Sequence, residues 1–220
     1  MRSRLCTAMP MCLVLCLCFT FAAVGEEMKP IQLPAPNLDQ SKSLVQALKD
    51  RKSTREYAAT ELSHQTLANL LWAAFGINRP DSGKRTAPSA RNRQEIQVYV
   101  TTARGAYVYD PRGNKLIPVV ADDIRALTGT QAYVATAPVN LVYVADLAKF
   151  GEGREAEKML MSGVDTGFIG ENVYLYCASA GLATVFRASI DRGKLAQLLK
   201  LRPLQRITFA QSVGHPKTQK

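Results

Sequence analysis

The sequence has few of the side chains that build disulfide frameworks and metal clusters. It contains five cysteines in 220 residues, and four of them fall within the first 18 positions: Cys6, Cys12, Cys16 and Cys18. Cys177 stands alone in the rest of the chain, so no disulfide framework or cysteine metal cluster is expected there. The two histidines, His64 and His215, are far apart and lack metal-ligand spacing. The sequence therefore predicts neither a metal site nor a catalytic histidine pair.

Aromatic side chains are also scarce, at 7% of residues, although the chain carries a formal net charge of +10. A basic chain can bind nucleic acid, anionic lipid or a phosphorylated cofactor. Most of the basic residues in the first half of the expected domain gather in three short stretches, at 51–55, 79–85 and 91–93, rather than in one stripe. Because stacking aromatics are few and no nucleic-acid-binding module is present, this distribution favours a phosphorylated cofactor.

The N-terminus has the order of a secretory signal. Arg2 and Arg4 precede an apolar run at 13–24, and small residues lead to Gly25. A membrane span needs about 20 apolar residues, so the sequence predicts a cleavable signal peptide over residues 1–25, with an uncleaved anchor as the alternative. The mature chain would keep 26 basic and 18 acidic residues, since only Arg2 and Arg4 are lost. It would be exported, periplasmic or secreted, and would acquire any cofactor outside the cytoplasm.

Residues 26–40 are rich in proline and predict an extended N-terminal arm, followed by one folded domain over residues 41–217. Apolar residues at helical spacing, together with Ser63 and Asp191 as N-caps, predict the helices of that domain. The expected helices span 41–50, 63–75, 154–180 and 191–199, with short ones at 122–127 and 131–135. His64 should be exposed near a helix start, and Cys177 should be a small buried residue of the long helix.

Alternating apolar residues predict the strands of the domain. The expected strands span 96–100, 107–109, 116–117, 139–145 and 207–213, with a turn at 110–114. Residues 79–94 contain Pro80, Gly83 and Pro88 without an apolar period, and predict a long polar loop. Two to five antiparallel strands with helices on both sides predict an α+β sandwich.

Three short segments carry polar groups suited to an anionic ligand. Segment 51–55 reads Arg-Lys-Ser-Thr-Arg beside a helix end, which suits a phosphate or a polarised carbonyl, or is a solvated charged turn. Loop 85–94 offers Asn92 and Gln94 on one side of the chain, or is an ordinary polar loop. Gly181 either ends the long helix in a simple turn or precedes backbone amides that face a ligand. Taken singly, each segment leaves both interpretations open.

The joint occurrence of these segments, in this order, resembles the nitroreductase superfamily, and the SagB-type branch with its thiazoline and oxazoline oxidases is the most similar. The shared pattern comprises the 51–55 segment, Leu70–Arg79, Pro88–Gln94, Asp165 with Gly167 and Asn172, and Gly181-Leu182. It extends over most of 43–216. The resemblance implies an α+β fold with a central, mostly antiparallel sheet, a long central helix and bound FMN. It also implies an interlocked homodimer with both active sites at the subunit interface.

The resemblance further implies which residues contact FMN. They are Arg51, Lys52, Ser53, Arg55, Pro88, Ser89, Asn92, Gly181, Leu182 and Lys217. Arg51, Ser53 and Arg55 would hold the phosphate, the ribityl chain or the pyrimidine edge of the flavin. The loop with Pro88, Ser89 and Asn92 would approach FMN from the other subunit. The backbone amides of Gly181 and Leu182 would lie near the reactive N5 atom, and Lys217 would help to bind the phosphate.

The implied function is that of an FMN-dependent oxidoreductase of nitroreductase type. The flavin would carry hydride or electrons between a donor and a small organic substrate, so no catalytic protein nucleophile or base is expected. Arg55 would lie at the N1 and O2 edge of the ring. Export separates the protein from nicotinamide donors, which leaves the electron donor open. The alternative is an exported, non-catalytic protein of the same fold that binds flavin or another anion.

Overall fold

The computed structural model describes residues 28–38 and 42–217 of the chain, so the predicted signal peptide lies outside the described residues. Within them, residues 28–38 include a short strand, β1 (Ile31–Gln32), that pairs with the edge of the main sheet. None of the described helices is long and apolar enough to cross a membrane.

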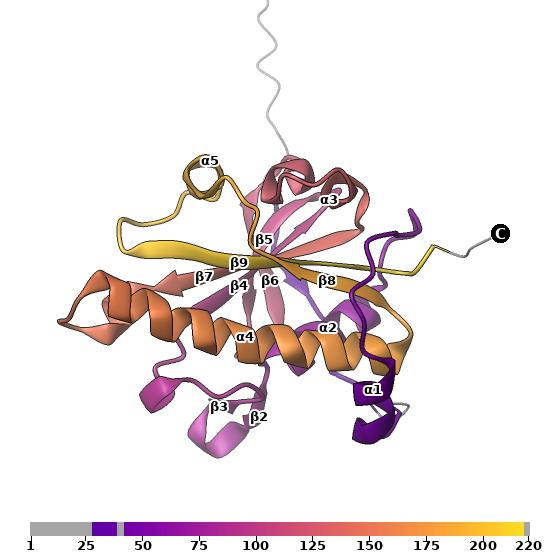
Figure 1. The fold of residues 1–220 in the computed structure, drawn as a ribbon, viewed down its shortest axis with the longest axis horizontal. Helices are drawn as coiled ribbons and strands as arrows, with labels where there is room; N and C mark the ends of the chain where they lie inside the picture. Colours follow the sequence, from indigo (N-terminus) through magenta and orange to yellow (C-terminus); the bar gives the residue numbers. More distant parts are fainter. Residues whose placement is uncertain (1–27, 39–41, 218–220) are drawn as a thin grey trace, which may run out of the picture.

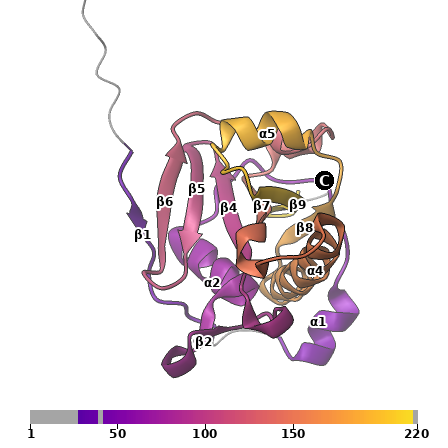
Figure 2. The ribbon, with the colours of Figure 1, turned by 90° about the vertical axis from the view of Figure 1, so that its left-hand side faces the viewer.

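The described residues form a seven-stranded sheet in which every neighbouring pair of strands is antiparallel (Figures 1 and 2). Its order is β1-β6-β5-β4-β7-β9-β8. The strands are β4 (Ile96–Thr102), β5 (Gly105–Asp110), β6 (Lys115–Val120), β7 (Val139–Asp146), β8 (Ala183–Arg187) and β9 (Gln205–Gly214). The expected antiparallel α+β architecture is confirmed, but the expected two to five strands are too few. The missed strands are β1, which has two residues, and β8, which starts three residues after the last residue of a helix and lacks a clear alternation.

Strand β7 shows how the sheet separates two hydrophobic cores. Val139, Leu141 and Tyr143 belong to the core on one face, whereas Val142 and Val144 belong to the core on the other. Successive side chains of a strand point to opposite faces, so a strand buried on both sides reads as a continuous apolar run. All eight residues of β7 are buried, which explains that run in the sequence.

Helices cover both faces of the sheet, as expected. α2 (His64–Phe75) and the long α4 (Glu155–Ala180) lie on one face, and α5 (Arg192–Leu198) lies on the other (Figure 2). The predicted N-caps are confirmed, because the Ser63 side chain accepts from the Thr66 amide and the Asp191 side chain accepts from the Lys194 amide. His64 is exposed and Cys177 is buried, also as expected.

Two regions differ from the expectation in detail. The 79–94 segment contains a small hairpin of β2 (Ile77–Arg79) and β3 (Lys84–Arg85), closed by Gly83 at φ 63°, rather than an unstructured loop. The two short helices expected near 122–135 are a 3-10 helix at Arg125–Thr128 and α3 (Tyr133–Thr136). Short polar hairpins and single helical turns have too few apolar residues for a period to appear.

Helix α1 (Leu44–Asp50) forms where expected, but most of its apolar residues do not join the core of the chain. Ala47 is buried, whereas Leu44, Val45 and Leu48 are between 54% and 64% exposed. Figure 1 shows α1 beside the C-terminal end of α4, at the margin of the molecule. The helical period in this segment therefore marks an uncovered apolar face.

The core on the α2 face should control stability. Leu71→Ala removes a side chain that is 0% exposed, so we expect the free energy of unfolding to fall by about 2–5 kcal/mol in denaturant titrations. Leu204→Ala, at a position 52% exposed, is the matched control and should change it by less than about 0.5 kcal/mol. Equal effects of the two substitutions would contradict the described packing.

Candidate functional site

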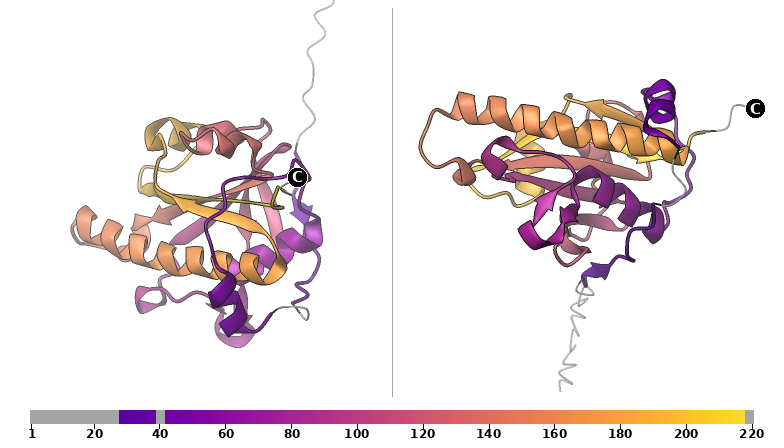
Figure 3. Two further views of the ribbon diagram at one scale, coloured as in Figure 1. Left: turned by 45° about the vertical axis from the view of Figure 1, so that its right-hand side comes forward. Right: turned by 90° about the horizontal axis from the view of Figure 1, so that it is seen from below.

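The segment that follows α1 is held across the start of β8 and the end of the described chain. The Thr54 amide donates to the Thr184 carbonyl at 2.9 Å, and the Ala58 amide donates to the His215 carbonyl at 2.9 Å. Tyr57 also forms an isolated antiparallel bridge with Pro216. These backbone contacts bring the basic 51–55 segment beside the C-terminal end of α4, an arrangement visible in both views of Figure 3.

A cleft of about 920 Å³ opens at this junction. Its walls come from α1, the segment after it, the C-terminal half of α4, the start of β8 and the C-terminal residues. The lining residues are Lys42, Lys49, Asp50, Lys52, Ser53, Thr54, Arg55, Glu56, Tyr174, Cys177, Ala178, Gly181, Leu182, Ala183, Thr184, Pro216 and Lys217. The volume is at the upper end of the range of small-molecule and cofactor sites, about 300–1,000 Å³.

The cleft brings together six of the ten residues proposed from the sequence: Lys52, Ser53, Arg55, Gly181, Leu182 and Lys217. Arg51 is the C-cap of α1 and lies at the rim, with its guanidinium carbon 5.3 Å from the centre of the Tyr174 ring. Lys217 reaches the cleft because its amide donates to the Glu56 carbonyl at 3.4 Å. Pro88, Ser89 and Asn92 lie outside the cleft, on the loop before β4.

Tyr174 is a cleft residue that the sequence interpretation missed. Its hydroxyl lies 2.8 Å from the Ser53 hydroxyl and accepts a hydrogen bond from the Phe186 amide at 2.9 Å. A signal was available, because Cys177, Ala178 and Gly181 follow Tyr174 at offsets of three, four and seven, the spacing of one helix face. Those spacings place Tyr174 on the face of α4 that ends at Gly181.

Positive charge dominates the cleft. Five basic residues line it, Lys42, Lys49, Lys52, Arg55 and Lys217, against the two acidic residues Asp50 and Glu56. Lys42 forms an ion pair with Asp50 at 2.7 Å, and this hydrogen bond holds the pKa of the Asp50 carboxyl below its usual value. Asp50 is therefore ionised and already paired, so the remaining cations can attract an anionic ligand.

The backbone at Gly181 corrects one expectation. Gly181 adopts φ 69° and ends α4, and its amide donates to the Cys177 carbonyl. The Leu182 amide donates to the same carbonyl at 2.8 Å. Both amides are thus used to close the helix, so the expectation that they are free to face a ligand is wrong. The residues still line the cleft, but their amides are not open donors.

Cys177 is unsuited to act as a nucleophile or redox thiol. Its side chain is fully buried, and burial raises the pKa of the thiol well above its usual value. A protonated thiol is a poor nucleophile. Cys177 therefore packs as a small apolar group beneath the cleft, as the sequence suggested.

The loop that carries Pro88, Ser89 and Asn92 has an unusual backbone. Arg91, Asn92 and Gln94 have φ values of 54°, 53° and 50°, in the left-handed region that favours glycine. Strained backbone of this kind costs on the order of 1–3 kcal/mol per residue and persists only where neighbouring contacts hold it. Here the Ser89 hydroxyl accepts from the Gln94 amide at 2.9 Å, and Asp165 of α4 accepts from the Ala90 amide at 2.9 Å.

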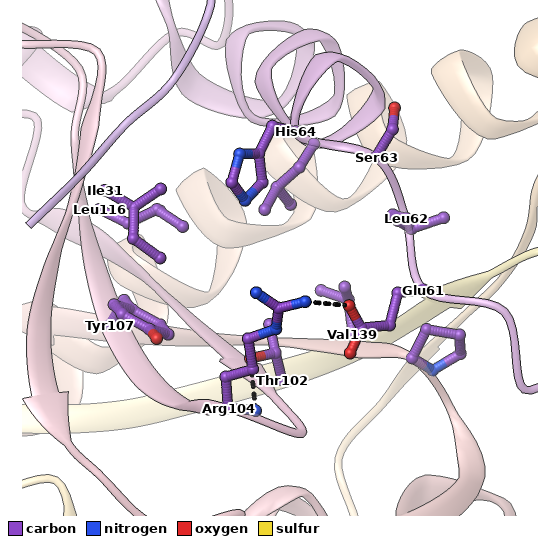
Figure 4. A pocket seen from close by; sticks show the side chains of 12 residues that line it. Ile31, Glu61, Leu62, Ser63, His64, Thr102, Arg104, Tyr107, Leu116 and Val139 are labelled. Carbon is purple, nitrogen blue, oxygen red and sulfur yellow. Dashed lines mark hydrogen bonds and ion pairs between the residues drawn. The ribbon is translucent and has the colours of Figure 1, made fainter. Parts of the chain in front are cut away.

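A second cavity, of about 350 Å³, lies between the start of α2 and the β4–β5 hairpin (Figure 4). Its walls are mostly apolar, with Ile31, Leu67 and Leu116 among them, and an ion pair between Arg104 and Glu61 at 3.1 Å crosses its mouth. It shares no lining residue with the basic cleft. No residue proposed from the sequence for cofactor binding lines it. Among the described residues, no group of three or more His, Cys, Asp or Glu side chains could hold a metal ion.

The Tyr174 hydroxyl should couple the two sides of the cleft. Ser53→Ala removes one hydrogen bond and should cost about 0.5–1.5 kcal/mol in the free energy of unfolding. Tyr174→Phe also leaves the half-buried Phe186 amide without its acceptor, so it should cost more, about 1–3 kcal/mol. Denaturant titration of both variants measures the two losses in the free energy of unfolding. A larger loss for Ser53→Ala than for Tyr174→Phe would contradict the prediction.

Comparison with known proteins shows the family and the fold of the chain. The chain is 38% identical, with a TM-score of 0.83, to a solved structure named as a nitroreductase from Ralstonia eutropha JMP134, over 90% of this chain and 94% of that one. It is 27% identical to a protein of Methanocaldococcus jannaschii that also carries the nitroreductase name, over 81% of this chain and 93% of that one. The NADPH:FMN oxidoreductase of Vibrio harveyi shares the fold, at 20% identity and a TM-score of 0.60, over 80% of this chain and 69% of that one. The family model described as "Nitroreductase family" matches residues 48–215, so the chain belongs to the nitroreductase family.

Proposed function

We propose that this protein is an FMN-dependent oxidoreductase that acts on a small organic molecule. The observation that carries the proposal is the basic cleft, where the 51–55 segment, the end of α4 and Lys217 meet around about 920 Å³. Family membership supports oxidoreductase chemistry in general. The Vibrio harveyi relative, which is named as an NADPH:FMN oxidoreductase, makes FMN the reasonable flavin.

The donor set of the cleft fits a phosphorylated flavin. Lys52 and Lys217 provide cations for a phosphate, and the Ser53 hydroxyl provides a hydrogen-bonding group. Bound FMN would supply the hydride or electron transfer, while the protein binds and orients it. We assign Arg55 to the N1 and O2 edge of the ring, where its positive charge favours negative charge on the flavin.

The protein is proposed to act as a homodimer. Four apolar side chains of α4 are exposed on a single chain: Leu160, Met161, Val164 and Phe168. Three more are exposed on α1: Leu44, Val45 and Leu48. Exposed apolar residues gathered on helix faces are typical of interfaces. Pro88, Ser89 and Asn92 lie outside the cleft of their own chain, so we propose that they complete the cleft of a partner subunit.

The cellular setting remains part of the proposal. The predicted signal peptide supports export, where a quinone or a redox protein would replace a nicotinamide as donor. We propose the SagB-type branch as the finer assignment, on the joint occurrence of the 51–55 segment, the Pro88–Gln94 loop and Gly181-Leu182. A non-catalytic flavin- or anion-binding protein of the same fold would bind ligand in the same cleft but would show no redox turnover.

Flavin binding is tested by colour and by one arginine. The purified mature protein should be yellow, bleach with dithionite and recover with an electron acceptor. Arg55→Ala should weaken FMN binding by about 1.5–3 kcal/mol, because a charge-assisted hydrogen bond is lost. Arg104→Ala, at an exposed site outside the cleft, is the control and should bind like the unchanged protein. A colourless protein that ignores added FMN would disprove the proposal.

The homodimer is tested by sedimentation. The mature protein should sediment as a dimer, and Phe168→Glu should give monomers because it places a charge within the exposed apolar face of α4. Leu204→Glu, at an exposed apolar position on neither helix, should leave the dimer intact. Monomers of the unchanged protein with FMN fully bound would contradict the interfacial site.

A further inference from the structure

Two buried carboxyl groups lie behind the Pro88–Gln94 loop. Glu95, directly before β4, is 0% exposed, and neither of its carboxylate oxygens has a hydrogen-bond partner in the part of the chain that the structure describes. Asp165 of α4 is 3% exposed and lies close enough for its charge to act on Glu95. Asp165 also accepts the hydrogen bond from the Ala90 amide at 2.9 Å. The pair therefore connects α4 with the loop.

Such a pair cannot hold two negative charges without a large penalty. Burial disfavours the ionised form of a carboxyl, and a neighbouring carboxylate disfavours it further. Burial raises the pKa of Glu95 to about 7, and the Asp165 carboxyl contributes to that rise. At mildly acidic pH, Glu95 is therefore neutral in the folded protein, and Asp165 remains free to accept from Ala90.

The positive charges nearby offset this effect only in part. Lys149 lowers the pKa of Glu95, but it is the last and smallest of the contributions. The Lys149 ammonium donates to the Gln94 carbonyl at 2.6 Å, and the partial loss of its hydration lowers its pKa. The charged groups around Lys149 are Asp146, Arg85 and Arg202, and they have mixed signs. No other charged group acts on Glu95 strongly enough to replace the proton.

We propose that Glu95 and Asp165 are positioning residues: while the buried Glu95 carboxyl is protonated, the Asp165 carboxyl holds the Ala90 amide and keeps the Pro88–Gln94 loop in its left-handed conformation. Loss of the proton to solvent leaves two negative charges in a buried space, which separates the carboxylates and weakens the Asp165 contact with Ala90. The strained residues Arg91, Asn92 and Gln94 then relax. We call Glu95, Asp165 and the Asp165 contact with the Ala90 amide the latch. Where the loop completes a flavin site, this latch sets the pH range of flavin binding, and that part of the inference rests on the proposed function.

The pH window follows from the direction of the shift. The Glu95 carboxyl has its pKa raised in the folded protein, from an ordinary value of 4.5 to about 7. A raised acid pKa means that the folded state binds more protons than the unfolded state between these values. The contribution to loop order is thus fully present below the ordinary value and is lost as the pH rises through about 7.

Hydrogen exchange on the flavin-free mature protein tests the latch directly. Amides of residues 88–94 are followed at about pH 5.5 and about pH 8, and the rates are corrected for intrinsic exchange. Protection should fall about tenfold at the higher pH, because one pH unit above the pKa leaves about one-tenth of the Glu95 carboxyls protonated. Glu95→Gln, which cannot ionise, should show protection that does not change with pH. Glu171→Gln, an equal charge change at an exposed position of α4, should behave like the unchanged protein.

A second variant serves if Glu95→Gln does not fold. Asp165→Asn keeps an oxygen that can accept from the Ala90 amide but removes the negative neighbour, so the pKa of Glu95 should fall and protection should be lost at a lower pH than in the unchanged protein. Because burial is the larger cause of the raised pKa, the shift of the midpoint should be modest and a pH-dependent loss of protection should remain. Protection that is independent of pH in both the unchanged protein and Asp165→Asn overturns the proposal, as does an equal fall in Glu95→Gln.

A parallel FMN titration separates the latch from the proposed function. FMN affinity of the unchanged protein should weaken between the two pH values, and that of Glu95→Gln should stay constant. If no FMN binds at either pH, the proposed function fails. The exchange experiment still tests whether the ionisation of Glu95 controls the order of the loop. If FMN binds equally at both pH values although the loop loses protection, the loop does not contribute to the flavin site and that part of the inference is wrong.

Discussion

The docking of residues 54–58 onto β8 and the C-terminal residues is the contact on which the cleft depends. Two backbone hydrogen bonds, Thr54 to Thr184 and Ala58 to His215, hold a polar segment that has little apolar surface of its own. They place Arg55 beside Lys217 in one cleft although the two are far apart in the sequence. The end of α4 completes the cleft, because Tyr174 contacts Ser53 on one side and Phe186 on the other.

The elements with a long apolar period could be predicted from the sequence. Ser63 and Asp191 cap their helices as expected, and the buried run of β7 is a central strand. β8 could not be predicted with the same means, since it follows the Gly181 cap and gains its strand conformation from pairing with β9. Residue types and order were enough to nominate Lys52, Ser53 and Arg55. The sequence did not predict that the Gly181 and Leu182 amides both donate to the Cys177 carbonyl, because residue types alone do not show which hydrogen bonds form at a helix end.

The two groups of nominated residues differ in how they are held. The cleft residues are fixed by ordinary backbone pairing, whereas the Pro88–Gln94 loop depends on side-chain contacts that oppose its backbone strain. One of those contacts joins the Ala90 amide to the buried carboxyl of Asp165, which lies near Glu95. The sequence motif did not single out Glu95. The loop thus contacts the middle of α4, at Asp165, whereas the cleft lies at the C-terminal end of that helix. Exposed apolar residues on α4 offer a surface through which a second subunit could bring the two parts together.

The central claim is that the cations of the cleft bind the phosphate of a flavin. The most direct measurement is the affinity of the mature, flavin-free protein for FMN and for riboflavin, which has the same ring but no phosphate. The account predicts that FMN binds at least about tenfold more tightly, because charge-assisted hydrogen bonds contribute about 1.5–3 kcal/mol. Equal affinities, or tighter binding of riboflavin, would contradict it.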